Sequence, residues 1–147
     1  KWYDISWKGD EQKSGGVATN IGVHFFDMLS WIFGDVQEIE THLHEKHKAS
    51  GYLEFENSRV RWYLSIDAND LPKEIQEKQQ RTFRSITVDG NALEFSNGFT
   101  DLHTLSYQEI LKGNGFNLEE AKPSIEIIHT IRNQKANFKY SKHPFLK

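Results

Sequence analysis

The longest apolar segment of the chain lies between Ser14 and Gly34, with the sequence SGGVATNIGVHFFDMLSWIFG. Its apolar residues recur every three to four positions, the period of an α-helix with one buried face. Gly34 stands where a left-handed C-cap would end such a helix, and the apolar character of the segment predicts that the helix is buried. The predicted apolar surface consists of Ile21, Phe25, Met28, Leu29 and Ile32, flanked by Val23, Phe26 and Phe33.

Three polar residues interrupt this segment at helical spacing. Asn20, His24 and Asp27 stand at i, i+4 and i+7, so they share one face of the predicted helix. An unpaired buried polar group costs about 1–3 kcal/mol, so the row predicts hydrogen-bonding partners or a ligand. Two interpretations are open: a core histidine with satisfied hydrogen bonds, or a histidine that contacts a ligand. The pair Gly15 and Gly16 favours the ligand, because glycine permits close backbone approach and a helix N-terminus attracts anions.

Alternation of apolar and polar residues with a period of two predicts several strands after this helix. Two of their connections are predicted to be hairpin turns, at Asn57-Ser58 and at Asp89-Gly90. At least four strands with one apolar face need a cover of helices on that face. The predicted strand segments are 36–46, 52–56, 59–66 and a pair within 81–95.

Helices near the end of the sequence are predicted to supply that cover. One spans residues 104–112 and stops at Gly113, and a second begins at Pro123, because proline is tolerated at the first helical position. The predicted buried stripe of the second helix is Ile125, Ile128 and Ile131. We expect residues 67–80 to form an exposed excursion, and the terminal NFKYSKHPFLK, with few packing signals, to form a loop or a short strand. The pattern predicts an α+β fold, an open and mostly antiparallel sheet with helices packed on one face.

Composition excludes several classes of function. The 147 residues include 18 basic and 21 acidic ones, a net charge of -3, so the chain carries no broad basic surface for nucleic acid. It shows neither an apolar run of membrane-spanning length nor a signal peptide. The absence of cysteine excludes disulfides and thiol chemistry. We expect a single domain over residues 1–147, located in the cytoplasm and without membrane insertion.

The segment GGVATNIGVHFFDMLSWIFG resembles the glycine-rich, histidine-bearing helix in the C-terminal domain of the glucose-fructose oxidoreductase/inositol dehydrogenase (Gfo/Idh/MocA) family. The family pattern is a glycine pair, an amide or carboxylate four residues before a histidine, and an aspartate three residues after it. Gly15, Gly16, Asn20, His24 and Asp27 match this pattern, although many members carry aspartate where this chain has asparagine. The segments KWYDISWKGDEQKSGG, RTFRSITVDG and GFTDLHTLSYQEILKGNGF are similar to one branch, the UDP-N-acetylglucosaminuronate 3-dehydrogenases of lipopolysaccharide biosynthesis.

The resemblance implies the substrate-binding and oligomerisation domain of an NAD-dependent nucleotide-sugar dehydrogenase that oxidises the sugar 3-hydroxyl. His24 matches the catalytic histidine, which takes or shares the hydroxyl proton with a lysine outside this chain. Asn20 would orient the sugar or the histidine, and Asp27 would support helix packing or the imidazole tautomer. The other predicted substrate-binding residues, for which ordinary surface packing is the alternative, are Tyr3, Trp7, Lys8, Gly15 and Gly16.

The implied cofactor is NAD or NADP, which the family binds mainly in a Rossmann domain. The G-x-G-x-x-G fingerprint of that domain is absent from this chain. We therefore expect the chain to be the C-terminal part of a longer enzyme and to be inactive alone. No metal is expected. Relatives form subunit contacts through the outer sheet face, so we expect a homo-oligomer, dimer or tetramer. Outward-facing residues that suit either such an interface or a solvated sheet are Tyr52, Arg59, Arg61 and Tyr63.

Two other functions remain open from the sequence. A non-catalytic ligand-binding or assembly module of the same fold would lack a working cofactor domain. A metal-dependent hydrolase would need His24 and Asp27 to converge with His42, His44 or His103. Alternation places His42 and His44 on one strand face without a third clustered ligand, which favours a solvated face over a metal site. The exact sugar, the choice between NAD and NADP, and the release of the cofactor in each turnover are left open.

Overall fold

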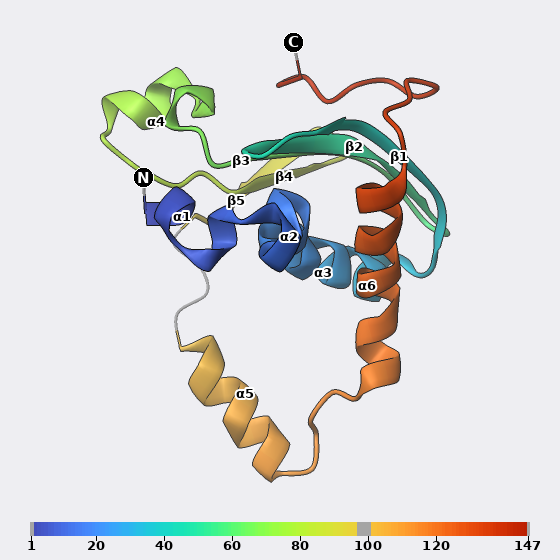
Figure 1. The fold of residues 1–147 in the computed structure, drawn as a ribbon. Helices are drawn as coiled ribbons and strands as arrows, with labels where there is room; N and C mark the ends of the chain where they lie inside the picture. Colours follow the sequence, from blue (N-terminus) through green and yellow to red (C-terminus); the bar gives the residue numbers. More distant parts are fainter. Residues whose placement is uncertain (1, 97–100, 147) are drawn as a thin grey trace. The chain divides into compact units, whose positions relative to one another are not determined.

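The computed structural model describes residues 2–96 and 101–146, and its architecture belongs to the predicted α+β class (Figure 1). The chain divides into two compact units, one formed by Lys1–Ile66 with Leu118–Lys147 and the other by Asp67–Asn117. The helical elements of the first unit are α1 (Trp2–Ile5), the 3-10 turn η1 (Trp7–Gly9), α2 (Glu11–Ser14), the π-helical turn η2 (Ala18–Gly22), α3 (Val23–Phe33) and α6 (Leu118–Asn133). Its strands are β1 (Val36–His44), β2 (Lys48–Phe55) and β3 (Arg59–Ser65).

The first unit is built around a three-stranded antiparallel sheet in the order β1-β2-β3. The predicted hairpin between β2 and β3 is confirmed, with Glu54 opposite Arg59 next to the turn. Helices α3 and α6 pack on one face of the sheet (Figure 1). The predicted cover by the helix around Pro123 is confirmed, whereas the helix predicted at 104–112 contributes nothing to this core, because none of the residues Leu102–Leu111 is buried. Phe26 of α3 meets Trp62 of β3 edge to face, with ring centroids 5.2 Å apart. The core between the layers includes Phe26, Leu29, Leu53, Phe55, Trp62, Ile127, Ile128 and Ile131.

The buried face of α3 differs from the predicted one by about one residue position. Phe26 and Leu29 are buried, whereas Ile32, predicted to be buried, is 52% exposed. The position of Gly22, one turn before Phe26, explains the difference. A Cβ atom at Gly22 would lie 3.1 Å from Leu64 of β3, so the side of the helix that bears glycine is the side that approaches the sheet.

Helix α6 begins at Leu118 rather than at Pro123, so the proline lies inside it. Glu119 and Glu120 occupy the first turn, where carboxylates interact favourably with the helix dipole, and this extends the helix upstream of the proline. Ile125, predicted to be buried, is 55% exposed. The buried residues of α6 are Ser124, Ile127, Ile128 and Ile131.

A β-bulge in β1 separates the two histidines that alternation places on one strand face. The pairing of β1 with β2 shifts after Thr41, so an extra residue stands in β1. His42 lies beside Glu40, with Nε2 2.7 Å from a carboxylate oxygen. His44 instead points toward the glycine pair, and its Nε2 is 3.6 Å from the position that a Cβ of Gly16 would occupy. The prediction of a shared face is wrong because an inserted residue reverses the facing of every later side chain.

The segment after α6, which we call the C-terminal strap (residues 137–146), runs over the face of the sheet opposite the helices (Figure 1). Just before it, the Gln134 side chain donates to the Ile39 carbonyl at 3.0 Å and accepts from the Thr41 backbone N–H at 3.1 Å. These bonds satisfy backbone groups on the free edge of β1, where an unpaired edge could otherwise pair with another chain. Tyr140 of the strap stacks on Tyr52 of β2 with ring centroids 4.1 Å apart. The terminal segment therefore has no regular secondary structure, but it packs against the sheet.

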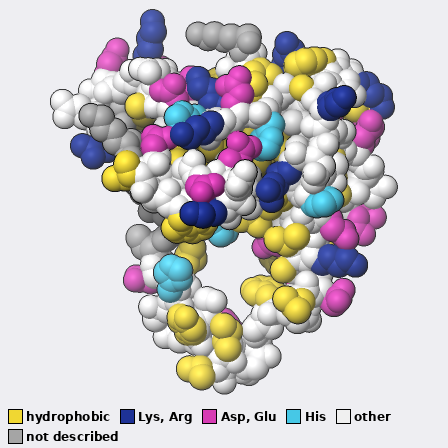
Figure 2. All heavy atoms as spheres, in the orientation of Figure 1, with side chains coloured by type: hydrophobic (Ala, Val, Ile, Leu, Met, Phe, Trp, Pro, Cys, Tyr) yellow, Lys and Arg dark blue, Asp and Glu magenta, His cyan; other side chains and the backbone are white. Residues whose placement is uncertain are grey.

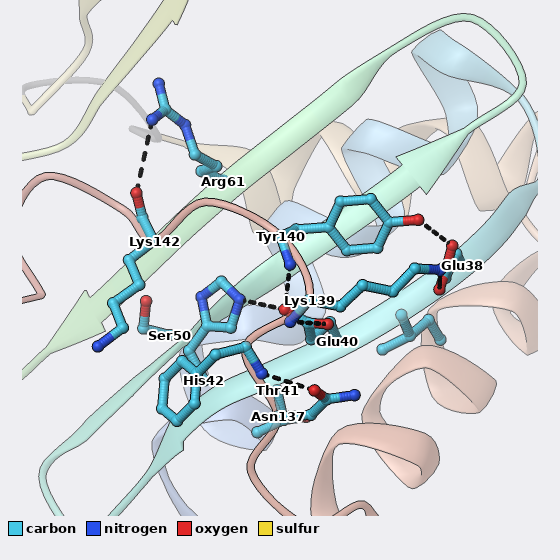
Figure 3. Close-up of polar contacts among 12 residues, drawn as sticks. Glu38, Glu40, Thr41, His42, Ser50, Arg61, Asn137, Lys139, Tyr140 and Lys142 are labelled. Carbon is cyan, nitrogen blue, oxygen red and sulfur yellow. Dashed lines mark hydrogen bonds and ion pairs between the residues drawn. The ribbon is translucent and has the colours of Figure 1, made fainter.

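Glu40 of β1 anchors the strap (Figure 3). Its side chain is buried and accepts hydrogen bonds from the backbone N–H groups of Lys139 and Tyr140, both at 2.9 Å, and from His42 Nε2. Burial opposes ionisation, but the bonds from Tyr140, His42 and Lys139 outweigh it and hold the pKa of Glu40 below its usual value. Beside it, Glu38 pairs with the Lys139 ammonium at 2.7 Å and accepts from the Tyr140 hydroxyl. The outer sheet face, predicted to be open, is thus partly covered by the chain itself.

The second unit contains the 3-10 turn η3 (Ala68–Asp70), α4 (Lys73–Glu77), β4 (Ser85–Val88), β5 (Asn91–Glu94) and α5 (Leu102–Leu111). Strands β4 and β5 form the hairpin predicted at Asp89-Gly90, where the φ angles are 49° and 82°. Among the described strands they pair only with each other, so they do not extend the sheet of the first unit. Hydrophobic side chains are exposed along α5 (Figure 2), among them Leu105, Tyr107 and Leu111. None of the described helices is long and apolar enough to cross a membrane.

Candidate active site

Two glycines connect α2 to the π-helical turn η2. Asp10 caps the start of α2 by accepting hydrogen bonds from its first backbone N–H groups. Gly15 ends the helix in the left-handed conformation, at φ 74°, and Gly16 follows at φ 80°. A Cβ atom at Gly15 would collide with the Thr19 hydroxyl and lie 3.0 Å from Thr19 Cβ. Backbone conformation and available space therefore both require glycine at position 15.

Asn20 lies in η2, a type of turn that is rare in proteins and frequent at functional sites. Its amide nitrogen donates toward the Gly16 carbonyl at 3.1 Å, the Ser14 carbonyl at 3.4 Å and the Tyr3 hydroxyl at 3.3 Å. These bonds connect the turn to α1, to the end of α2 and to the glycine pair. The structure thus brings together three of the predicted substrate-binding positions. It uses the Asn20 nitrogen within the protein, which leaves the amide oxygen for a ligand.

His24 and Asp27 lie on the exposed side of α3. The prediction that both belong to a polar row on a buried helix is wrong, because the rotation of α3 turns Phe26 and Leu29 toward the sheet and these two side chains away from it. Within residues 2–96 and 101–146, neither side chain has a hydrogen-bond partner, so Asp27 does not fix the tautomer of His24. Trp31, 84% exposed, continues this side one turn further. The imidazole is accessible to a ligand.

The N-terminal aromatic segment provides one buried ring and one exposed ring. Tyr3 is 7% exposed, and burial raises its pKa; the hydrogen bond from Asn20 acts in the opposite direction, and the Asp4 charge adds to the increase. Trp7 in η1 is 58% exposed, and the Lys8 ammonium lies 5.9 Å from its ring centroid in cation–π geometry. Tyr3 therefore belongs to the Asn20 cluster, whereas Trp7 and Lys8 form a pair at the surface of η1.

Thr19, Ser14 and His44 lie beside the glycine pair, although they are not among the predicted site residues. The Thr19 hydroxyl donates to the Gly15 carbonyl at 2.8 Å, and the Ser14 hydroxyl accepts from the Gly16 N–H at 3.1 Å. His44 Nε2 is buried beside Gly16 without a hydrogen-bond partner among the described residues. A signal for Thr19 exists in the sequence, because a Thr-Asn pair stands four residues after the glycine pair, the spacing at which such side chains reach back to carbonyls. No local pattern marks His44, since its orientation depends on the bulge.

The described part of the chain contains no group of three or more His, Cys, Asp or Glu side chains placed to hold a metal ion. The hydrolase alternative requires such a convergence and has no support in these residues. The arrangement offers an accessible imidazole for proton transfer, an exposed indole for stacking and an ammonium group for an anion. The G-x-G-x-x-G dinucleotide fingerprint is absent from the sequence.

Comparison with protein families defines the class of protein. Residues 1–72 match the Gfo/Idh/MocA family model described as "Oxidoreductase family, C-terminal alpha/beta domain". The match includes the glycine pair, η2 and the histidine-bearing helix α3. The chain belongs to the Gfo/Idh/MocA oxidoreductase family, as its C-terminal domain. This confirms the resemblance seen in the sequence.

Two solved structures of the WlbA (WbpB) dehydrogenase from Thermus thermophilus are similar to nearly the whole chain. The structure in complex with NAD and alpha-ketoglutarate is 49% identical with a TM-score of 0.94, and the match covers 99% of this chain and 48% of that one. The structure in complex with NAD and UDP-GlcNAcA is 48% identical with a TM-score of 0.94 and the same coverage. The chain therefore spans about half the length of these relatives.

Proposed function

We propose that this domain binds the nucleotide sugar in an NAD-dependent dehydrogenase that oxidises the 3-hydroxyl of a UDP-N-acetylglucosaminuronate in lipopolysaccharide biosynthesis. The observation that carries the proposal is His24, an exposed imidazole on the helix that follows two left-handed glycines. The identity of 49% to an NAD-bound dehydrogenase supports the cofactor, and the UDP-GlcNAcA complex of the same dehydrogenase supports the substrate. In this proposal the chain is a single substrate-binding domain and acts with a cofactor domain that it does not contain.

His24 serves as the acid/base group of this reaction. A bound nicotinamide would supply the hydride acceptor for the C–H bond at carbon 3 of the sugar. The hydroxyl on that carbon must lose its proton as the C–H bond breaks, which leaves a 3-keto sugar. An imidazole suits this step because its ordinary pKa of about 6.5 lies near the working pH. A lysine from the cofactor domain shares the proton with His24.

The other predicted residues hold the sugar nucleotide. The Asn20 oxygen accepts from a sugar hydroxyl, since its nitrogen is already engaged by the protein. Trp7 offers an exposed ring for stacking, and Lys8 beside it meets a phosphate or carboxylate. Further proposed contacts are the Tyr3 hydroxyl and the backbone of Gly15 and Gly16, and Asp27 is proposed as a supporting residue on the same exposed side of α3 as His24. NADP is the alternative cofactor.

The proposed enzyme is a homo-oligomer, dimer or tetramer, and acts in the cytoplasm. Copies are proposed to meet through the outer sheet face. In that case the strap takes part in the contact, because Tyr140 already covers Tyr52 on this face. Arg59 and Arg61 remain exposed there and suit an interface.

Turnover of the full-length enzyme with UDP-GlcNAcA and NAD, followed by NADH absorbance, tests the function. We expect His24→Asn to lower kcat by on the order of 10²–10⁴-fold with the melting temperature unchanged, because a positioned acid/base group contributes about that much. His129→Asn is the matched control, since His129 is an exposed histidine on α6. The isolated chain should show no turnover. Full activity of the His24 variant, or NADH formation by the isolated chain, would overturn the proposal.

A further inference from the structure

We propose that Thr19 and Asn20 are positioning residues that hold the π-helical turn η2 and thereby set the orientation of the glycine pair relative to His24. This inference rests on the proposed acid/base role of His24. It assigns the two residues an effect on the chemistry that is exerted through the backbone of the turn rather than by contact with the reacting atoms.

The two side chains tie η2 to the glycine pair by equivalent hydrogen bonds. The Thr19 hydroxyl donates to the carbonyl of Gly15 at 2.8 Å, and the Asn20 amide donates to that of Gly16 at 3.1 Å. Each bond reaches back four residues. The Gly15 bond also depends on glycine, because a Cβ there would collide with the Thr19 hydroxyl. The glycine pair and the Thr-Asn pair therefore form one local structure.

The far end of η2 is fixed against the sheet. A Cβ atom at Gly22 would lie 2.7 Å from the Phe26 ring and 3.1 Å from Leu64, so this glycine allows the backbone to approach β3 closely. Phe26 and Leu29 then hold α3 in the core. The turn is thus clamped between the glycine pair on one side and the sheet on the other.

A π-helical turn contains one residue more than an α-helical turn of the same extent. Each residue of an α-helix turns the chain by about 100°, so loss of the π turn would rotate the glycine pair and His24 relative to each other by about that angle. Because the core holds α3, the movement would fall on the substrate-binding side, at Gly15 and Gly16. The imidazole and the bound sugar would then no longer be aligned. Misplacement of reacting groups by about 1 Å can cost 10²-fold in rate.

Thr19→Val in the full-length enzyme tests this inference, because valine keeps the branched shape and removes only the hydroxyl. We expect kcat to fall on the order of 10- to 100-fold, with the KM for NAD unchanged, and Thr19→Ser to restore it. Thr130→Val is the matched control. Thr130 donates the same kind of bond, at 3.0 Å to the Glu126 carbonyl, within α6. We expect that variant to keep its kcat.

The outcomes separate the inference from the proposed function. Full kcat of Thr19→Val per folded molecule, with His24→Asn still impaired, would overturn the positioning role and leave the function intact. Full activity of His24→Asn would remove the function itself. If Thr19→Val does not fold, Asn20→Leu takes its place, because leucine has a similar size and cannot donate to the Gly16 carbonyl. A lower kcat in that variant supports the inference, whereas a higher KM for the sugar alone assigns Asn20 to substrate contact and overturns it.

Discussion

Replacement of Glu40 by glutamine should loosen the C-terminal strap and destabilise the first unit. Glu40 is 2% exposed and accepts from two strap N–H groups and from His42. Glutamine fits the same space, but its NH₂ group faces at least one of these donors. Hydrogen bonds to a charged group contribute about 1.5–3 kcal/mol each, so we expect Glu40→Gln to lower the free energy of unfolding by about 3 kcal/mol. A domain of this size would then melt about 6–12 °C lower.

Urea unfolding at several pH values checks this expectation, together with hydrogen exchange of the Lys139 and Tyr140 amides. The pKa of Glu40 is lowered in the folded protein, so its contribution is present above the unfolded value of about 4.3 and is lost as the pH falls through the folded value. The free energy of unfolding of Glu40→Gln should lack this pH-dependent contribution. Glu38→Gln is the control, and its effect should be much smaller because the Glu38–Lys139 pair is exposed. Unchanged stability and unchanged exchange in Glu40→Gln would refute the anchoring role.

Two further expectations concern the strap and the glycine pair. Burial, with a smaller effect from the Arg61 charge, lowers the pKa of His143, so the folded state resists protonation and the stability of the strap should fall as the pH drops through about 6.5. Hydrogen exchange of the strap amides should therefore depend on pH across that range, and His143→Gln should remove this dependence. An equal pH dependence in the variant would contradict the expectation. Gly15→Ala should destabilise by about 1–3 kcal/mol through its left-handed backbone and the collision with Thr19. Gly113→Ala, with a similar φ of 85° but open space around it, should cost less in thermal unfolding, and equal losses would show that the collision is relieved.

The elements that the sequence predicts correctly are those with local signals. The glycine pair and Gly34 bracket the segment of η2 and α3, and the two hairpins appear where their turn residues stand. The candidate site is a prediction from the same kind of local signal, because Asn20 and His24 stand at a recognisable spacing after the glycines. The exposure of His24 could not be predicted from the sequence. That property depends on which side of α3 meets β3, and the small size of Gly22 decides it.

The features that could not be predicted depend on contacts between distant parts of the chain. The extra residue at His42 places the His44 side chain on the opposite face of the strand, and no glycine or turn residue in the sequence marks the position of this bulge. The strap is held by Glu40, whose partner Tyr140 stands 100 residues later in the sequence. The aromatic residues of the strap do not recur with the period of a helix or a strand, because the segment forms neither, so no packing face can be predicted from them. Local periodicity carries no information about such pairs.

The division of the first unit has a consequence for its synthesis. Strand β1 emerges from the ribosome long before the C-terminal residues that hydrogen-bond to it. The bonds from Thr41 to Gln134 and from Lys139 to Glu38 span 93 and 101 positions of the sequence. The whole of Asp67–Asn117 is translated in between. Throughout that interval the nascent chain exposes an unfinished strand edge and an apolar face that lacks α6, the conditions under which growing chains aggregate or recruit chaperones. Synonymous codons that slow translation between β3 and α6 should therefore reduce the soluble yield without altering the finished protein.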